Sequence, residues 1–192
     1  MANYIFVRHG QTDWNIEGRW QGHSNTNLNE TGFHQAQNAA EILRDTHISA
    51  VYSSDLLRAM NTAKAINQYH GHTIIEEPRL REQHLGKWEG LYVKEVPDKY
   101  PELWQKFIDY PIETVITDGE SLQQLVDRMW DFYLEKEKMH QPDESILVVA
   151  HGLSLAVLLC KLNGLPLTEA YKQIPANATP IFFSGKIIDQ PQ

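Results

Sequence analysis

The stretch YIFVRHGQT, residues 4–12, decides the fold class of this chain. Its first four residues are bulky and apolar, which is typical of a strand buried on both faces of a sheet. Arg8 and His9 end the apolar run, and Gly10 marks a sharp turn directly after it. In α/β proteins, ligands bind beyond the carboxyl ends of the strands. The sequence therefore predicts that the first strand delivers Arg8 and His9 to a binding site.

Further apolar runs alternate with helix-like segments along the 192 residues. We expect one α/β domain over residues 1–192, with a mostly parallel central sheet and helices on both faces as a three-layer sandwich. Ser54 and Asp55 are expected to cap the helix that begins near residue 56. The expected strands cover residues 4–7, 50–53, 73–76, 145–150 and 180–183, and the expected helices cover residues 31–44, 56–69, 102–108, 122–139 and 153–162.

Composition argues against a nucleic-acid-binding, a secreted and a membrane protein. A net charge of −8 makes a nucleic-acid surface a poor interpretation. The single cysteine, Cys160, excludes an internal disulfide and lies in an apolar run that we expect in the core. The N-terminus does not resemble a signal peptide, and no segment approaches the roughly 18 apolar residues of a membrane helix. We expect a soluble cytoplasmic protein without membrane partners, and a homo-oligomer stays open.

A second His-Gly pair ends another apolar run, at His151-Gly152, and repeats the pattern of His9-Gly10. Two strand-end histidines could bind a metal, but metal sites usually add carboxylates or thiolates and have no adjacent guanidinium. Arg8 lies beside His9, and Arg58 falls in the first turn of the helix after the second strand. By itself, Arg58 is typical of a surface helix. Together, these groups and a helix N-terminus favour an oxyanion, and phosphate in particular.

Six motifs then point to a family. The chain resembles the histidine phosphatase superfamily, in its phosphoglycerate-mutase-like branch, from Phe6 to about Phe183. The motifs are VRHGQTDWN (7–15), LNETG (28–32), YSSDLLRA (52–59) with TA (62–63), LRE (80–82) with GKWEG (86–90), DGES (118–121), and VVAHG (148–152).

The resemblance implies catalytic roles for five residues. His9 would be the nucleophile and would carry the phosphoryl group as phosphohistidine, while Arg8, Arg58 and His151 form the pocket around it. A protonated His151 would add positive charge to that pocket. Glu82 would donate the proton to the leaving group, although a solvated loop carboxylate is the alternative interpretation. This scheme requires no metal and no cofactor.

The resemblance also implies substrate contacts. Asn15 would donate to the phosphate, Gln21 and Gly22 would reach the substrate, and Gly152 would join His151 there. Asn177 is a further candidate, in a loop that the family places near the site. Glu120 is a competing carboxylate that helix capping explains.

Three functions remain open on the sequence alone. A phosphatase would hydrolyse small-molecule phosphate monoesters, a cofactor-dependent phosphoglycerate mutase would return the phosphoryl group to another hydroxyl, and a regulator would only bind phosphorylated ligands. Residues 91–118 carry three lysines against six acidic residues, together with several aromatic residues. That segment fits a lid over a weakly charged substrate better than a clamp on a bisphosphate. We therefore predict a phosphatase, with the mutase as the first alternative.

Overall fold

The computed structural model describes residues 1–184 and 187–188. Its strands are β1 (Asn3–Arg8), β2 (Ala50–Ser53), β3 (Ile74–Glu76), β4 (Ser145–Ala150), β5 (Pro180–Phe183) and β6 (Ile187–Ile188). Its helices are α1 (Asp13–Glu17), α2 (Glu30–Leu43), α3 (Leu57–Asn67), α4 (Val96–Lys99), α5 (Pro101–Asp109), α6 (Leu122–Met139) and α7 (Gly152–Leu162). Short 3₁₀ segments cover Pro78–Leu80, Gly86–Trp88, Val93–Glu95 and Leu167–Gln173.

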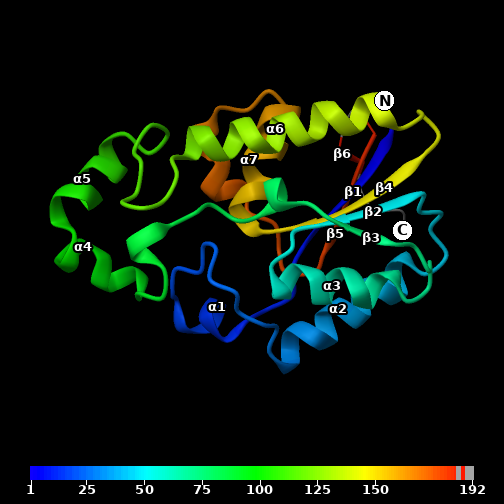
Figure 1. The fold of residues 1–192 in the computed structure, drawn as a ribbon, viewed down its shortest axis with the longest axis horizontal. Coiled ribbons are helices and arrows are strands. Elements are labelled where there is room, and N and C mark those ends of the chain that lie inside the picture. The colour runs from blue at the N-terminus through cyan, green and yellow to red at the C-terminus, as the bar shows by residue number, and fades with distance from the viewer. Residues whose placement is uncertain (185–186, 189–192) are drawn as a thin grey trace.

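One sheet organises the molecule, with the strand order β3-β2-β4-β1-β5-β6. The pairs β1–β4, β2–β4 and β2–β3 are parallel, whereas β5 runs antiparallel to both β1 and β6. This confirms the expected α/β fold with a mostly parallel sheet. Helices α6 and α7 lie on one face of the sheet, and α2 and α3 lie on the other (Figure 1).

The buried strands supply both cores because successive side chains point to opposite faces. Tyr4 and Phe6 of β1 pack with α6 and α7, while Ile5 and Val7 pack with α2 and α3. Cys160 is buried in α7, as its apolar run predicts. None of the described helices is both long enough and apolar enough to cross a membrane.

The register of β1 against β4 positions the two histidines. Arg8 is paired with Ala150 at the carboxyl ends of these neighbouring strands. His9 continues the ladder for one more step, because its N–H donates to the carbonyl of Ala150 at 3.0 Å. His151 follows Ala150 directly, so parallel pairing alone brings His9 and His151 to the same edge of the sheet.

Two local features differ from the sequence predictions. The loop after β1 contains a short helix, α1, whose N-cap Thr12 exchanges hydrogen bonds with Asn15 in a capping box. Ser54 and Asp55 were expected to cap α3, but its N-cap is Leu56, which provides no side-chain cap. Long-range partners explain this error, because Ser54 contacts His151 and Asp55 binds Arg81.

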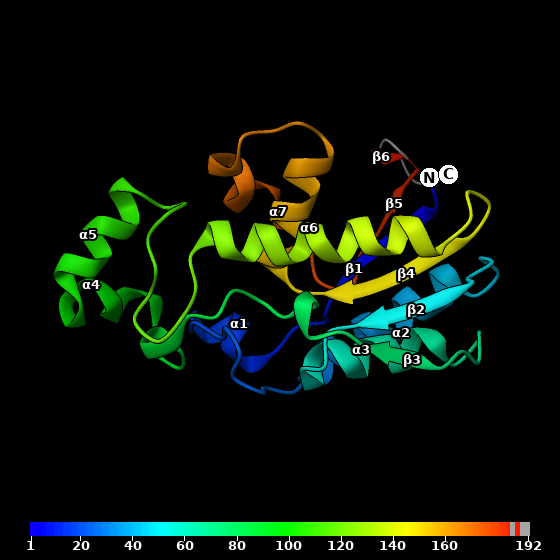
Figure 2. The same ribbon diagram turned by 45° about the horizontal axis from the view of Figure 1, so that its top comes forward.

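The segment 91–118 stands away from the sheet. Helices α4 and α5 lie beyond its end and form a separate lobe (Figures 1 and 2). A small core centred on Trp88 stabilises them, and Val96, Phe107 and Ile116 are buried in it. The predicted helix at residues 102–108 corresponds to α5, whereas α4 was not predicted from the sequence.

The close backbone contact between the β1 turn and α2 gives the first prediction. A Cβ at Gly32 would lie 2.0 Å from the carbonyl oxygen of Gln11, which is backbone and cannot swing away. We expect Gly32→Ala to lower the free energy of unfolding by about 1–3 kcal/mol, as overpacked sites do. Urea unfolding measures this change. Asn38→Ala, at an exposed position of α2, is the control and should change stability by less than about 0.5 kcal/mol; equal values would contradict the steric argument.

Candidate active site

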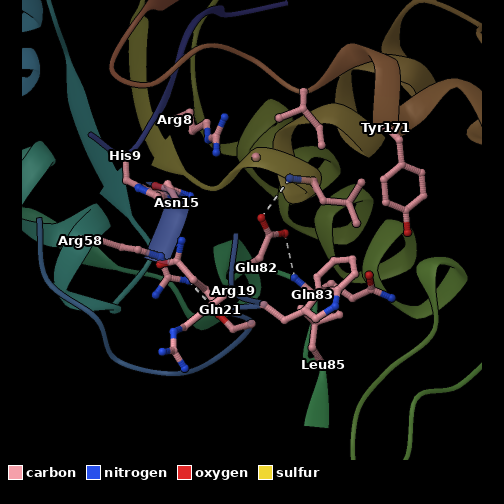
Figure 3. Close-up of a pocket in the computed structure, with 15 residues that line it drawn as sticks. Arg8, His9, Asn15, Arg19, Gln21, Arg58, Glu82, Gln83, Leu85 and Tyr171 are labelled. Carbon is pink, nitrogen blue, oxygen red and sulfur yellow. Dashed lines mark hydrogen bonds between the residues drawn. The ribbon is translucent and has the colours of Figure 1, made fainter. Parts of the chain in front are cut away.

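A cavity of about 330 Å³ opens at the carboxyl ends of β1 and β4. In Figure 3, Arg8, His9 and Arg58 lie on one side of Glu82, and Tyr171 lies on the other. The cavity is also lined by Asn15, Arg19, Trp20, Gln21, Gly22, Gln83, Leu85, Gly152, Leu153 and Ile174. Within the described residues, no three His, Cys, Asp or Glu side chains gather closely enough to hold a metal ion.

His9 is held as a neutral imidazole with one defined tautomer. Its Nδ1 lies 2.7 Å from the carbonyl oxygen of Gly10, which can only accept, so Nδ1 carries the proton. Nε2 therefore keeps its lone pair. Burial lowers the pKa of His9 well below its usual value, and the neighbouring guanidinium of Arg58 lowers it further. The acceptor that fixes the tautomer, which the sequence did not reveal, is thus the main chain of the next residue.

Other contacts fix the backbone of His9. Asn177 donates its side-chain amide to the carbonyl of His9 at 2.8 Å. The N–H of Gly10 donates to the hydroxyl of Thr62, at 3.0 Å. Asn177 thus lies near the site, as the resemblance implies, but it supports His9 and is not among the residues that line the cavity.

His151 lies beside His9, with ring centroids 5.1 Å apart, and it is fully buried and not among the residues that line the cavity. Its Nδ1 accepts from Nε of Arg58 at 3.1 Å, so Nε2 carries the proton and donates to the Ser54 hydroxyl at 2.8 Å. Burial, followed by the charge of Arg58, lowers the pKa of His151 well below its usual value. This geometry keeps His151 neutral, whereas the protonated His151 expected in the transition state stays a prediction.

Arg58 is fully buried, which contradicts the interpretation as a surface residue of α3. Its Nη2 donates to the carbonyl of Gly22 at 2.8 Å, and Nη1 donates to the carbonyl of Ser24 at 2.7 Å. Burial lowers its pKa to about 10, so the guanidinium remains charged at neutral pH. Because these acceptors are neutral, the positive charge remains available to an anion in the cavity.

Arg8 provides a second cation. Its Nη1 donates to the carbonyl of Pro175 at 2.8 Å, while its buried Nε has no partner in the described part of the chain. Gly152 allows this side chain to pass close to the backbone, since a Cβ there would lie 3.3 Å from Nε of Arg8. This packing explains a glycine directly after His151.

The helix N-terminus at the cavity belongs to α7 and not, as expected, to α3. At the start of α3, the N–H of Leu57 is occupied by the side chain of Asn25 at 2.8 Å. At the start of α7, the N–H groups of Leu153 and Ser154 donate to the carboxylate of Glu82 at 3.0 and 3.1 Å. The helix end thus orients a carboxylate of the protein.

These contacts leave one defined position on Glu82. Its Oε1 accepts from the N–H of Gln83, and its Oε2 accepts from the N–H of Leu153 (Figure 3). The Oε1 also accepts from the N–H of Ser154. Each carboxylate oxygen offers about two lone-pair sites, so Oε2 retains one for a proton or a substrate. Glu82 is therefore a fixed carboxylate with one free coordination site, and not a freely solvated loop residue.

Two amide side chains reach the cavity with their nitrogens as donors. The Oδ1 of Asn15 accepts from the N–H of Thr12 at 3.0 Å, and the Oε1 of Gln21 accepts from the hydroxyl of Thr26 at 2.7 Å. Fixing each oxygen fixes the orientation of the amide. Asn15 and Gln21 thus keep N–H groups that can donate to an anion, and their contacts with a substrate stay predictions.

Arg128 supports the site and was missed in the sequence. It uses all five N–H donors: two bind the carboxylate of Glu120, and three bind the carbonyls of Arg79, Arg81 and Glu82. The planar fork of a guanidinium suits such a cluster of acceptors. Arg128 thereby fixes the backbone that carries Glu82, although nothing in its local sequence in α6 signals this role.

Glu120 was expected to cap a helix, and this expectation is wrong. Ser121 is the N-cap of α6 and forms a capping box with Gln124. The carboxylate of Glu120 instead accepts from the N–H of His84 at 2.8 Å and binds Arg128. His84 is 36 positions away and Arg128 is eight positions away, and neither spacing belongs to a helix cap, so the local pattern could not identify these partners.

Glu89, within GKWEG, connects two loops around the cavity. Its carboxylate accepts from the N–H of His23 at 2.8 Å, the hydroxyl of Ser24 at 2.9 Å and the N–H of Leu85 at 3.1 Å. A Cβ at Gly22 would lie 2.3 Å from this carboxylate. Glu89 thus fixes the loop whose carbonyls bind Arg58. The sequence did indicate Glu89, because it belongs to the GKWEG motif.

Comparisons with known proteins agree with this geometry. A model of the histidine phosphatase superfamily (branch 1) matches residues 4–181. Phosphoserine phosphatase 1 of Hydrogenobacter thermophilus is 34% identical over 88% of this chain and 80% of its own. The 2,3-bisphosphoglycerate-dependent phosphoglycerate mutase of Cytophaga hutchinsonii is 34% identical over 97% of this chain and 90% of its own. The structure of a mycobacterial glucosyl-3-phosphoglycerate phosphatase matches with a TM-score of 0.84 and 31% identity, over 95% of this chain and 92% of that one.

The chain therefore belongs to the histidine phosphatase superfamily, and it is an enzyme of the histidine phosphatase type.

The buried neutral histidines predict how stability depends on pH. The unfolded chain protonates His9 near pH 6.5, whereas the folded protein resists protonation until a much lower pH. The unfolded state therefore binds more protons below pH 6.5, and the free energy of unfolding falls as the pH is lowered. We expect His9→Asn to reduce this loss by up to about 1.4 kcal/mol per pH unit between pH 6.5 and 5. Urea unfolding across that range measures both slopes.

The control for this prediction is His34→Asn, at an exposed position of α2. It should keep the pH slope of the unmodified protein. Identical slopes for all three proteins would contradict the assignment of His9 as a buried neutral group.

Proposed function

We propose that this enzyme hydrolyses small phosphate monoesters through a phosphohistidine on His9. In the first step, the Nε2 lone pair of His9 attacks phosphorus while the bond from phosphorus to the ester oxygen breaks. Glu82 gives the departing oxygen its proton, so the alcohol leaves neutral. Arg8 and Arg58 stabilise the charge of the transferring phosphoryl group.

In the second step, water replaces the alcohol. The carboxylate of Glu82 takes a proton from that water as its oxygen attacks the phosphorus of phosphohistidine, and the P–N bond breaks. This step returns Glu82 to its protonated form, restores neutral His9 and releases inorganic phosphate. The N–H groups of Asn15 and Gln21 are further donors to the phosphoryl oxygens.

The hydrogen bond from Nδ1 of His9 to the carbonyl of Gly10 carries the proposal. An imidazole attacks only from an unprotonated nitrogen, and this contact leaves Nε2 as that nitrogen. The low pKa of His9 adds support, since the nucleophile is already neutral at physiological pH. His151 accepts from Nε of Arg58 and thereby holds this cation in place, while its own contact with the phosphate stays a prediction.

Hydrolysis is favoured over the mutase reaction by the charges around the cavity. A bisphosphate would need a second group of free cations there. Arg19 also lines the cavity, but its guanidinium is engaged by Glu17, the carbonyl of Gly90 and the hydroxyl of Tyr92. Residues 91–118 are net acidic as well. The mutase remains the alternative because a mutase is among the close relatives.

We also propose that residues 91–118 cover the substrate. One aromatic contact of this segment supports the role: Phe107 of α5 packs against Tyr171, with centroids 6.2 Å apart. Trp88 connects the segment to the cavity indirectly, because it packs against Phe107 at 5.2 Å and against Trp20 at 6.0 Å. Tyr171 and Trp20 both line the cavity. A cytoplasmic location is a proposal that rests on the one buried cysteine, which suits a reducing compartment.

Loss of the nucleophile gives a direct test. We expect His9→Ala to lower phosphate release from p-nitrophenyl phosphate by at least about 10³-fold, because the variant lacks the nitrogen that forms the covalent intermediate. Rapid acid or base quenching with a labelled ester should trap phosphohistidine in the unmodified enzyme and not in the variant. The control is His34→Ala, on the surface of α2. Full activity of His9→Ala would exclude His9 as the nucleophile.

The same assay separates the alternatives. A phosphatase releases phosphate from simple esters without a bisphosphate primer. Interconversion of phosphoglycerates that depends on such a primer, with negligible phosphate release, would favour the mutase.

The proton donor can be tested by varying the leaving group. We expect Glu82→Gln to slow phosphohistidine formation from an alkyl phosphate by about 10²–10⁴-fold, and formation from p-nitrophenyl phosphate much less, because nitrophenolate leaves without a proton. Single-turnover rates with the two esters measure this difference. Glu76→Gln, which changes an exposed carboxylate of β3, is the control. Equal slowing with both esters would exclude Glu82 as the acid.

A further inference from the structure

We propose that Gln83, assisted by Trp20, forms a subsite for the alcohol portion of the substrate, which must carry a hydrogen-bond donor and an acceptor beyond the ester oxygen. This inference rests on the proposed function, because it concerns the group that leaves from phosphorus. It adds a chemical requirement that the phosphoryl-transfer residues do not impose.

The amide of Gln83 is buried and oriented. The side chain is 1% exposed, and its Nε2 donates to the carbonyl of Glu120 at 3.1 Å. Since that carbonyl can only accept, the contact fixes which end of the amide is the oxygen. The oxygen, Oε1, is buried and has no hydrogen-bond partner in the described part of the chain, although Gln83 lines the cavity.

An unpaired buried carbonyl is costly, at about 1–3 kcal/mol, and such groups are rare in folded proteins. A donor on the bound substrate would remove that cost. An alkyl group in the same place would leave Oε1 without a partner and without water. Gln83 therefore favours substrates that place a hydrogen-bond donor at its Oε1 over substrates that place an alkyl group there.

Trp20 supplies the complementary group. Its indole N–H is also buried without a partner among the described residues, and it can only donate. The residue is anchored by main-chain hydrogen bonds, because its N–H donates to the carbonyl of Leu91 and its carbonyl accepts from Gly90. Trp20 and Gln83, which carry this donor and this acceptor, thus both line the cavity.

The position of Gln83 assigns it to the leaving alcohol. The N–H of Gln83 donates to the carboxylate of Glu82 at 2.9 Å, so the subsite adjoins the proposed acid. Figure 3 places Gln83 with Tyr171 and Leu85, across Glu82 from Arg8, His9 and Arg58. Apolar walls with a few placed polar atoms are typical of sites that select a small molecule.

Two kinds of alcohol present this chemistry. A polyol can donate to Gln83 and accept from Trp20 through hydroxyl groups. A hydroxy amino acid can donate through its ammonium group and accept through its carboxylate. A simple alkyl alcohol offers neither, so it leaves both buried atoms unpaired.

The experiment compares three esters that share a three-carbon skeleton: propyl phosphate, glycerol 1-phosphate and O-phosphoserine. We expect kcat/KM for at least one of the polar esters to exceed that for propyl phosphate by about 10- to 100-fold, as sites with buried polar groups discriminate against analogues that cannot pair with them. A preference for glycerol 1-phosphate assigns the subsite to polyols, and a preference for O-phosphoserine assigns it to amino acids.

Two variants link the preference to the residues. Gln83→Met keeps the length of the side chain and removes the acceptor, so the ratio of kcat/KM between the preferred ester and propyl phosphate should fall toward one. Trp20→Phe should lower that ratio in part. Gln37→Met, at an exposed position of α2, is the control and should keep the ratio.

The outcomes distinguish a failure of the subsite from a failure of the proposed phosphatase function. Equal kcat/KM for all three esters in the unmodified enzyme overturns the subsite, and so does an unchanged ratio in Gln83→Met. Neither result affects phosphate release itself. A failure to release phosphate from any ester overturns the proposed function, and the subsite with it.

Discussion

The parallel pairing of β1 with β4 is the constraint on which the site depends. It aligns Arg8 with Ala150, so that the next residue on each strand is a histidine and both rings leave the sheet at one edge. Buried apolar runs make this register secure, because a shift of one residue would turn every core side chain to the wrong face. The hydrophobic core thus determines the relative positions of the two histidines in the site. Arg58 reaches the same place from α3 and binds the second of these histidines.

The site concentrates positive charge without cancelling it. Arg58 is buried against carbonyl groups and a neutral imidazole, and not against a carboxylate. Carboxylates are present nearby, but Glu82 is bound by main-chain N–H groups and Glu89 by loop donors. Each charge is thus satisfied by dipoles of the backbone, which leaves the cations to face an incoming anion. In a chain with a net charge of −8, this local arrangement is what makes anion binding possible.

The sequence predicted the central strands well and the supporting contacts poorly, for physical reasons. A buried strand is a short apolar run, so residues 50–53, 145–150 and 180–183 were predicted with the bounds that the structure has. His9 and His151 could be predicted because each ends such a run. Ser54 illustrates the limit: its local pattern indicates a cap, but His151 occupies its hydroxyl. Arg128 could not be predicted, because its acceptors come from residues nearly fifty positions away.

The five-donor contact of Arg128 also constrains how this protein can diverge. A lysine offers three donors and no planar fork, so it would leave at least two of the five acceptors unpaired. One of those acceptors is the main-chain carbonyl of Glu82, which is present whatever side chain stands at that position. Arg128 and Glu120 should therefore be inherited together among descendants that retain this acid, and they should be lost together. We expect these two positions to covary because they hold the main chain of Glu82, although neither residue lines the cavity.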